Sequence, residues 1–285
     1  MSSEKQRTAW EKQMLVREKN RPTIHDYLPR IFEEFFELHG DRGYGDDGAI
    51  LGGIARLNGV PVTIIAEVKG RNLEENKRSN FAMPHPEGYR KALRLAKQAE
   101  KFHRPIICFI DTPGAFCGVE AEERGQGEAI AKNLAEFMSL KTPVVSVVLG
   151  EGGSGGALAL GVCGDLAMLE NALYSVISPR GAASILWKDA SREQEACEIM
   201  RITAQDLLEF GVADAIIPEP EDGAQGDLDK MSQNIKEYLV KTIAVKSKKD
   251  IDILQKERYT KFRKIGVFSE PSHEVQKAAA GNENE

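Results

Sequence analysis

The sequence predicts an α/β fold, because apolar strand-like segments alternate with amphipathic helical segments along most of the chain. Residues 105–110 and 143–149 are continuous apolar runs, a pattern typical of strands that are covered on both faces. Each run ends at a glycine-containing turn, at 111–116 and at 150–156. Because open sheets gather ligands at strand ends, these two turns are the first candidates for a functional site.

The N-terminal part of the fold is expected to contain a helix and a hairpin. Apolar residues at helical spacing after the possible cap Thr23 predict one amphipathic helix over 23–39, which Gly40 would end. Residues 51–68 form two strands around Asn58-Gly59, since that dipeptide tolerates the positive φ of a tight turn. We expect these two strands to pair antiparallel.

The later elements follow from the same signals. They are two helices with apolar stripes at 89–102 and 130–138, short strands at 166–169 and 174–177, a helix from Thr203 to Phe210, and a charged helix at 247–264. Thr203 and Asp206 can cap their helix, and Gly211 can end it. From residue 270 onward the composition favours a frayed tail.

Composition and charge exclude several classes of protein. The 285 residues hold 38 Lys and Arg against 44 Asp and Glu, a net charge of −6, so a nucleic-acid surface is not expected. No apolar run approaches the ~18 residues of a membrane helix, and the first residues lack a signal-peptide core. We therefore expect a cytoplasmic protein without a membrane segment.

The cysteines argue against a metal on this chain. Cys108, Cys117, Cys163 and Cys197 lie far apart and form no C-x-x-C pair. Neither a zinc ribbon nor a redox dithiol is therefore expected. We expect free, mostly buried thiols and no bound metal.

The glycine-rich turn at 150–156 matches the dinucleotide fingerprint G-x-G-x-x-G. Gly150, Gly152 and Gly155 supply its glycines, and Glu170 lies about 20 residues further along, where an acid that binds ribose is expected. A phosphate loop is excluded, because no Gly-Lys-Ser/Thr follows.

The same turn also matches the nucleophile elbow of serine hydrolases, with Ser154 as nucleophile. In elbow enzymes the catalytic histidine comes later in the chain, and only His273, in the expected tail, lies downstream. The upstream histidines that could still act as a base are His25, His39, His85 and His103. Ser154 is therefore expected to lack a base.

The third interpretation is an oxyanion site. N–H groups in the first turn of a helix lack intrahelical partners, and the helix dipole adds positive charge there. Four glycines among residues 152–156 let an oxygen approach the backbone. One such donor contributes roughly 3–4 kcal/mol to a transition state, without any side-chain nucleophile. The alternatives are a tight strand-to-helix packing turn at 150–156 and an Asx-type turn at 111–116.

Longer motifs match one family over residues 23–262. They stand at 38–42, 52–57, 86–95, 109–115, 121–126, 150–159 and 184–188. In these motifs the chain resembles the alpha subunits of bacterial acetyl-coenzyme A carboxylase carboxyltransferase. The resemblance implies a crotonase-like (ClpP/crotonase) fold, a spiral of ββα units with peripheral N- and C-terminal helices.

The resemblance also implies how the chain is divided. We expect a charged helical extension at 1–22, a crotonase-like carboxyltransferase domain at 23–245, a C-terminal helix at 246–268 and a flexible tail at 269–285.

The implied activity is carboxyl transfer. In this family, carboxybiotin on the biotin carboxyl carrier protein gives its carboxyl group to acetyl-CoA, which yields malonyl-CoA for fatty acid synthesis. The implied partners are a beta subunit that carries a zinc ribbon, in a complex of two alpha and two beta subunits, together with the carrier protein and biotin carboxylase. The alternatives are a stand-alone acyl-CoA hydratase or isomerase with Glu122 or Glu123 as base, a nicotinamide-binding module and a non-catalytic scaffold.

The resemblance assigns site residues by position. Gly155 and Gly156 would be catalytic, because their backbone N–H groups would bind the ureido oxygen of biotin, which itself would act as the base. The implied substrate-binding residues are Gly152, Gly153, Ser154, Thr112, Pro113, Gly114, Ala115, Ser178 and Pro179.

Several positions depart from the family pattern. Arg180 and Ala182 replace a common glutamate and a frequent cysteine. The other departures are Ala82, His85, Phe116 and Cys117.

Overall fold

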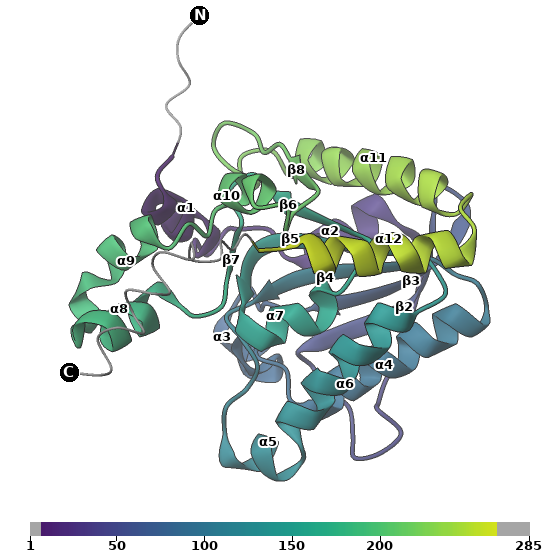
Figure 1. Cartoon of the computed structure of the whole chain (residues 1–285), viewed down its shortest axis with the longest axis horizontal. Helices are drawn as coiled ribbons and strands as arrows, with labels where there is room; N and C mark the ends of the chain where they lie inside the picture. Colours follow the sequence, from purple (N-terminus) through teal and green to yellow (C-terminus); the bar gives the residue numbers. More distant parts are fainter. Residues whose placement is uncertain (1–6, 267–285) are drawn as a thin grey trace, which may run out of the picture.

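A computed structural model describes residues 7–266 and shows an eight-stranded sheet with helices on both faces (Figure 1). The strands are β1 (Glu33–Glu37), β2 (Ile50–Leu57), β3 (Val60–Glu67), β4 (Ile106–Thr112), β5 (Val144–Gly153), β6 (Asp165–Leu169), β7 (Leu173–Ser175) and β8 (Ala215–Ile217). Their order is β1-β2-β3-β4-β5-β6-β8, and β7 pairs with the end of β5. The pairs β1–β2 and β2–β3 are antiparallel, and the other pairs are parallel.

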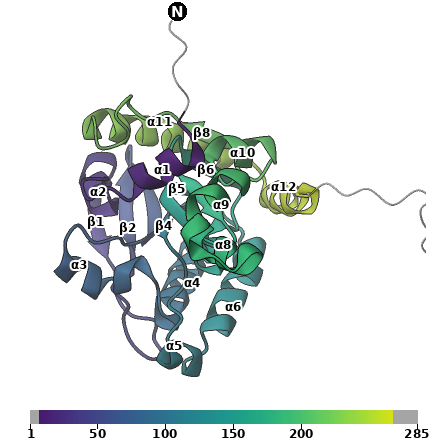
Figure 2. The same ribbon diagram turned by 90° about the vertical axis from the view of Figure 1, so that its left-hand side faces the viewer.

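Helices lie on both faces of the sheet and beside it. They are α1 (Ala9–Val16), α2 (Ile24–Ile31), α3 (Leu73–Arg78), α4 (Pro86–Lys101), α5 (Val119–Glu123), α6 (Gln126–Ser139), α7 (Ser154–Gly161), α8 (Pro179–Trp187), α9 (Glu193–Ile199), α10 (Ala204–Glu209), α11 (Leu228–Lys246) and α12 (Ile251–Lys264). Short 3-10 turns stand at η1 (Asn80–Ala82) and η2 (Ala190–Arg192). Figures 1 and 2 show α2 and α11 above the sheet and α4 and α6 below it. No helix within residues 7–266 is both long and apolar enough to span a bilayer.

The central strands confirm the α/β prediction. Every residue of β4 is buried, and β5 is buried from Val144 to Gly150. The continuous apolar runs therefore do belong to strands covered on both faces. Because β3 to β6 run parallel, the carboxyl ends of β4 and β5 meet at one edge of the sheet.

The hairpin prediction is confirmed in register and in turn geometry. Leu57 pairs with Val60, and the two residues between them have positive φ, 49° at Asn58 and 78° at Gly59. This conformation matches the right-handed twist of the flanking strands. The hairpin joins β2 and β3.

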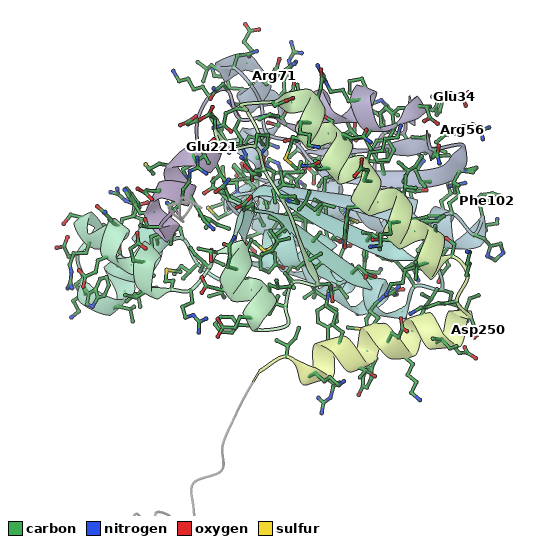
Figure 3. All side chains as sticks on the ribbon, turned by 90° about the horizontal axis from the view of Figure 1, so that it is seen from above. Glu34, Arg56, Arg71, Phe102, Glu221 and Asp250 are labelled. Atoms are coloured by element: carbon green, nitrogen blue, oxygen red, sulfur yellow. The ribbon has the colours of Figure 1, made fainter. Side chains whose placement is uncertain are left out.

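The prediction of one helix over 23–39 is wrong after residue 31. The capping box of Thr23 and Asp26 does start α2, but Phe32 has extended backbone angles and β1 follows. The apolar spacing of this segment is helical, but pairing with β2 makes residues 33–37 a strand, because contacts between distant segments override a short local pattern. Glu34 of β1 forms an ion pair with Arg56 of β2 at 2.7 Å across this edge (Figure 3).

The structure confirms the other predicted elements with small shifts. α4, α6, β6 and α12 stand where expected, and a capping box of Thr203 and Asp206 starts α10. The strand predicted at 174–177 lies at 173–175 instead, where it pairs with β5. The cysteines are free, and all but Cys117 are buried.

The division of the chain into an extension, a domain, a helix and a tail stays a prediction. The part assigned to the extension contains α1, and the tail at 269–285 lies outside the described residues. The later elements that the sequence analysis missed are the helices α8 and α9, the three-residue strand β8 and the long helix α11.

Candidate functional site

The glycine-rich segment 150–156 is mostly strand, so the prediction of a seven-residue turn is wrong. Residues up to Gly153 belong to β5, where Gly152 pairs with Thr112 of β4 and with Tyr174 of β7. The chain turns at Ser154, which has a φ of 52°, and α7 begins there. Absent side chains permit this close approach, since a Cβ on Gly153 would lie 2.1 Å from the carbonyl oxygen of Pro113.

The other predicted turn, at 111–116, packs against the start of α7. A Cβ on Gly156 would lie 2.6 Å from the amide nitrogen of Ala115 and 3.0 Å from the hydroxyl oxygen of Tyr89. In contrast, a Cβ on Gly155 would meet only Ile130, at 3.7 Å. The two sequence-predicted turns are therefore in contact, and Gly156 is the residue at their junction.

Main-chain donors collect at this junction. Gly155 and Gly156 are the second and third residues of α7, where helix geometry leaves N–H groups without intrahelical acceptors, and no side chain caps the helix. The N–H of Ala115 has no hydrogen-bond acceptor within residues 7–266. These donors, with the positive end of the helix dipole, suit an oxygen that carries negative charge.

The turn at 111–116 is held by a threonine and not by the Asx-type turn that was the alternative. Thr112 Oγ1 accepts a hydrogen bond from the N–H of Gly114 at 3.0 Å and donates one to the carbonyl oxygen of Ala82 at 2.5 Å. Asp111 still belongs to β4, and its Oδ1 accepts a hydrogen bond from the N–H of Glu151 at 3.0 Å. Asp111 thus ties β4 to β5 where the glycine stretch starts.

A second buried acid lies beside Asp111. Glu67 Oε2 accepts a hydrogen bond from the N–H of Asp111 at 3.2 Å, and Glu67 Oε1 has no partner among the described residues. Burial raises the pKa of Glu67 well above its usual value, and the nearby Asp111 raises it further. Burial also raises the pKa of Asp111. Burial beside the start of the glycine stretch therefore disfavours the ionised forms of both carboxyl groups.

A cavity of about 40 Å³ lies where β4, β5 and β7 end. The sequence-predicted residues that line it are Thr112, Pro113, Gly152, Gly153, Ser178 and Pro179. Gly114, Ala115 and Gly156 adjoin these residues through the contacts described above. Ser154 is exposed and, like Gly155, is not part of the lining.

The sequence analysis missed the contribution of α1 to this cavity. Gln13 and Arg17 line it, together with Glu151, Leu173, Ser175 and Ile202. Arg17 contacts Glu151 Oε1 through Nε at 2.8 Å and through a terminal nitrogen at 2.7 Å. The capping box of Thr8 and Glu11 is a readable signal for α1. No local pattern places that helix beside residues more than 130 positions away.

The serine-hydrolase interpretation finds no catalytic base in the described chain. His25 and His39 line a separate cavity of about 530 Å³, together with Arg71. His85 stacks on Phe116, and His103 lies just past the end of α4. No histidine within residues 7–266 hydrogen-bonds to Ser154, and His273 lies outside the described residues.

The dinucleotide fingerprint also lacks its required geometry. Gly150 and Gly152 lie inside β5, whereas the fingerprint needs a loop between strand and helix. The carboxylate of Glu170 accepts a hydrogen bond from the N–H of Glu219 at 3.0 Å. The residues that match the fingerprint therefore do not form a nucleotide-binding site.

The two main departures from the family pattern lie in α8. Arg180 is exposed in the first turn of that helix, whose cap is Ser178. Ala182 is buried in a small cluster with Ala183 and Ala196. Ala182 thus serves packing, while Arg180 adds a positive charge to the surface beside the cavity.

Comparison with known proteins gives one consistent family. The family model described as "Acetyl co-enzyme A carboxylase carboxyltransferase-like" matches residues 3–266. A Clostridium perfringens protein named acetyl-coenzyme A carboxylase carboxyl transferase subunit alpha is 59% identical over 267 residues, which cover 93% of this chain and 98% of that protein. A protein of the same name from Listeria monocytogenes is 57% identical over 92% of this chain and 82% of that protein.

Solved structures support the crotonase-like fold. Transcarboxylase 12S matches with a TM-score of 0.63 and 17% identity over 92% of this chain, which spans 46% of the transcarboxylase chain. A Pseudomonas malonate decarboxylase hetero-tetramer in complex with coenzyme A matches with a TM-score of 0.60 and 18% identity, over 84% of this chain and 93% of that chain. At these identities the likeness concerns the fold alone, and the crotonase-like prediction is confirmed.

Proposed function

This chain belongs to the acetyl-coenzyme A carboxylase carboxyltransferase family, and we infer that it is the alpha subunit of that enzyme, a biotin-dependent transferase that forms malonyl-CoA from acetyl-CoA. The observation that carries this inference is 59% identity to a named alpha subunit over nearly the full length of both chains. The alternative of a stand-alone hydratase is not favoured. Its possible bases, Glu122 and Glu123, are exposed in the last turn of α5 and do not line the cavity.

We propose that the backbone N–H groups of Gly155 and Gly156 hold the ureido oxygen of the biotin group. Their place in the first turn of α7 supports this role, and the unpaired N–H of Ala115 is a third donor next to Gly156. Carboxybiotin would supply the carboxyl group and the base for the reaction. The chain itself supplies fixed donors that need no reorganisation when negative charge develops, each worth roughly 3–4 kcal/mol.

The donor set fits an oxygen atom, but the cavity does not fit a whole ring. Its volume of about 40 Å³ is far below the roughly 300–1,000 Å³ of ordinary ligand pockets. We propose that the bicyclic ring lies outside this cavity, on the surface that the beta subunit covers. The residues that line the cavity, from Thr112-Pro113, Gly152-Gly153 and Ser178-Pro179, would shape the inner wall of the shared site.

The proposed partners follow from the subunit assignment. A beta subunit would complete the active site with its own acetyl-CoA surface and zinc ribbon, in a complex of two alpha and two beta chains. The biotin carboxyl carrier protein and biotin carboxylase would supply carboxybiotin in the cytoplasm. The alpha-subunit names of the relatives support the partnership with a beta subunit.

The test is reconstitution with the beta subunit of the same organism. Malonyl-CoA and biocytin are supplied, and acetyl-CoA is measured over time. We expect transfer by the mixed complex and none by either subunit alone, because the donors on this chain do not enclose a substrate. A mixed complex without transfer would refute the proposal, and so would hydration of an enoyl-CoA by this chain alone.

A further inference from the structure

An ion pair closes the cavity on the side of α1. Arg17 is the C-cap residue of α1. Two nitrogens of its guanidinium contact Glu151 Oε1, at 2.7 and 2.8 Å. Glu151 stands inside the glycine stretch, and its side chain is only 16% exposed. Both residues line the cavity with Gly152 and Gly153. A carboxylate therefore lies in the wall of a site that is proposed to handle negatively charged groups.

The other charges around Glu151 make Arg17 the principal compensating group. Lys69 Nζ lies 3.8 Å from the Glu151 carboxylate, a longer contact than that of Arg17. On the opposite side, Glu193 lies 3.6 Å from Arg17, and the carboxyl group of Asp111 accepts the Glu151 N–H. Without Arg17, the more distant Lys69 would be the one cation left within 4 Å of the Glu151 carboxylate among residues 7–266.

We propose that Arg17 is a positioning residue that neutralises Glu151, so that the site does not repel the carboxylate being transferred. The inference rests on the proposed function, because the transferred group carries its negative charge both on carboxybiotin and in malonyl-CoA. Like charges in a partly desolvated site interact over several ångströms with an effective dielectric constant of about 20. The sequence analysis placed Arg17 in the N-terminal extension and assigned it no role in the site.

The alternative is that the pair merely holds α1 in place, but α1 has other anchors. Ala9 and Val16 pack against Cys197 and Ile202. The N–H groups of Ala9 and Trp10 also donate to the carboxylate of Glu198, at 3.2 and 3.1 Å. Loss of the Arg17 guanidinium should therefore leave α1 docked.

The experiment uses the complex with the beta subunit and the malonyl-CoA to biocytin assay. The variants are R17A, R17K, E151Q and the double variant R17A/E151Q. Arg30→Ala is the matched control, because Arg30 of α2 pairs with Asp229 at 2.8 Å on the surface and does not line the cavity. Complex size and unfolding midpoint are recorded for each variant.

We expect R17A to lower kcat/KM about tenfold, since an uncompensated carboxylate then faces the substrate. R17A/E151Q should recover to within about threefold of wild type, and R17K should retain most of the activity, because each removes the uncompensated charge. R30A should match wild type. A double variant as slow as R17A would show that the pair acts through structure alone and would overturn the inference, as would an R17A variant with wild-type activity. If the wild-type complex transfers no carboxyl group from malonyl-CoA to biocytin, the proposed function is refuted, and this inference is refuted with it.

Discussion

At the scale of single residues, the candidate site depends on main-chain atoms. Gly155 and Gly156 are adjacent, yet a Cβ on Gly156 would press on the backbone of Ala115, while one on Gly155 would make only an ordinary contact with Ile130. Gly156 is therefore needed for close packing between two turns, and Gly155 is not. The same packing that requires glycine at 156 brings the free N–H of Ala115 beside the start of α7.

This contrast predicts different outcomes for two alanine variants. Gly156→Ala should displace the turn at 114–115 and misalign the donors, which lowers kcat about 100-fold, as expected for the loss of one oxyanion donor. Gly155→Ala keeps its N–H and has room for the methyl group, so it should stay within about threefold of wild type. The transfer assay with the mixed complex checks both variants. Equal rates for the two would contradict the assigned geometry.

At the scale of elements, a buried arginine attaches the C-terminal helix to the body. Arg258 of α12 is 1% exposed, and its guanidinium donates to the carbonyl oxygens of Phe137 at 2.7 Å, Leu140 at 3.0 Å and Thr142 at 3.0 Å. The first of these belongs to the last turn of α6, where carbonyl groups lack intrahelical donors. Arg258 therefore caps α6, the helix whose Ile130 borders Gly155.

Replacing this arginine should destabilise the fold. Arg258→Met removes the charged donor and leaves buried carbonyl oxygens unpaired, at a cost of about 3 kcal/mol in the free energy of unfolding. The neighbouring Tyr259→Ala alters an exposed side chain on the same helix and should change that free energy by less than about 0.5 kcal/mol. Urea unfolding of the two variants compares them directly. Equal midpoints would rule out the capping role.

At the scale of the whole molecule, α8 and α9 stand out from the body as a separate pair of helices (Figures 1 and 2). Ile185 and Leu186 of α8 are 70% and 63% exposed, and Val176 before α8 is 81% exposed, so large apolar side chains are left uncovered. The same helix begins at Pro179, which lines the cavity with its cap residue Ser178. Because the site is open beside this apolar surface, we expect the beta subunit to cover it.

Charge on this surface should therefore weaken the complex. Ile185→Asp together with Leu186→Asp should reduce affinity for the beta subunit at least about 100-fold, because charges would be buried in the interface. Phe102→Asp is the control, since Phe102 is also exposed but lies at the opposite end of the molecule (Figure 3). Size-exclusion chromatography and titration of the two subunits measure the effect. Unchanged affinity in the double variant would place the interface elsewhere.

The sequence alone determined the features that local physics encodes. Continuous apolar runs identified the buried strands, Asn58-Gly59 set the hairpin, and long motifs identified the family. These patterns predict structure because burial on both faces of a strand and a positive φ in a turn each restrict which residue types can occur within a few positions.

Only the tertiary structure decided the features that depend on distant contacts. Residues 33–37 became a strand because β2 was there to pair with them, and the glycines at 150–153 stayed in β5 because β4 and β7 flank them. Likewise, Arg17 reached Glu151 across 134 positions of sequence. The spacing of apolar residues indicates which face of a helix or strand is buried, but it does not indicate which distant segment packs against that face.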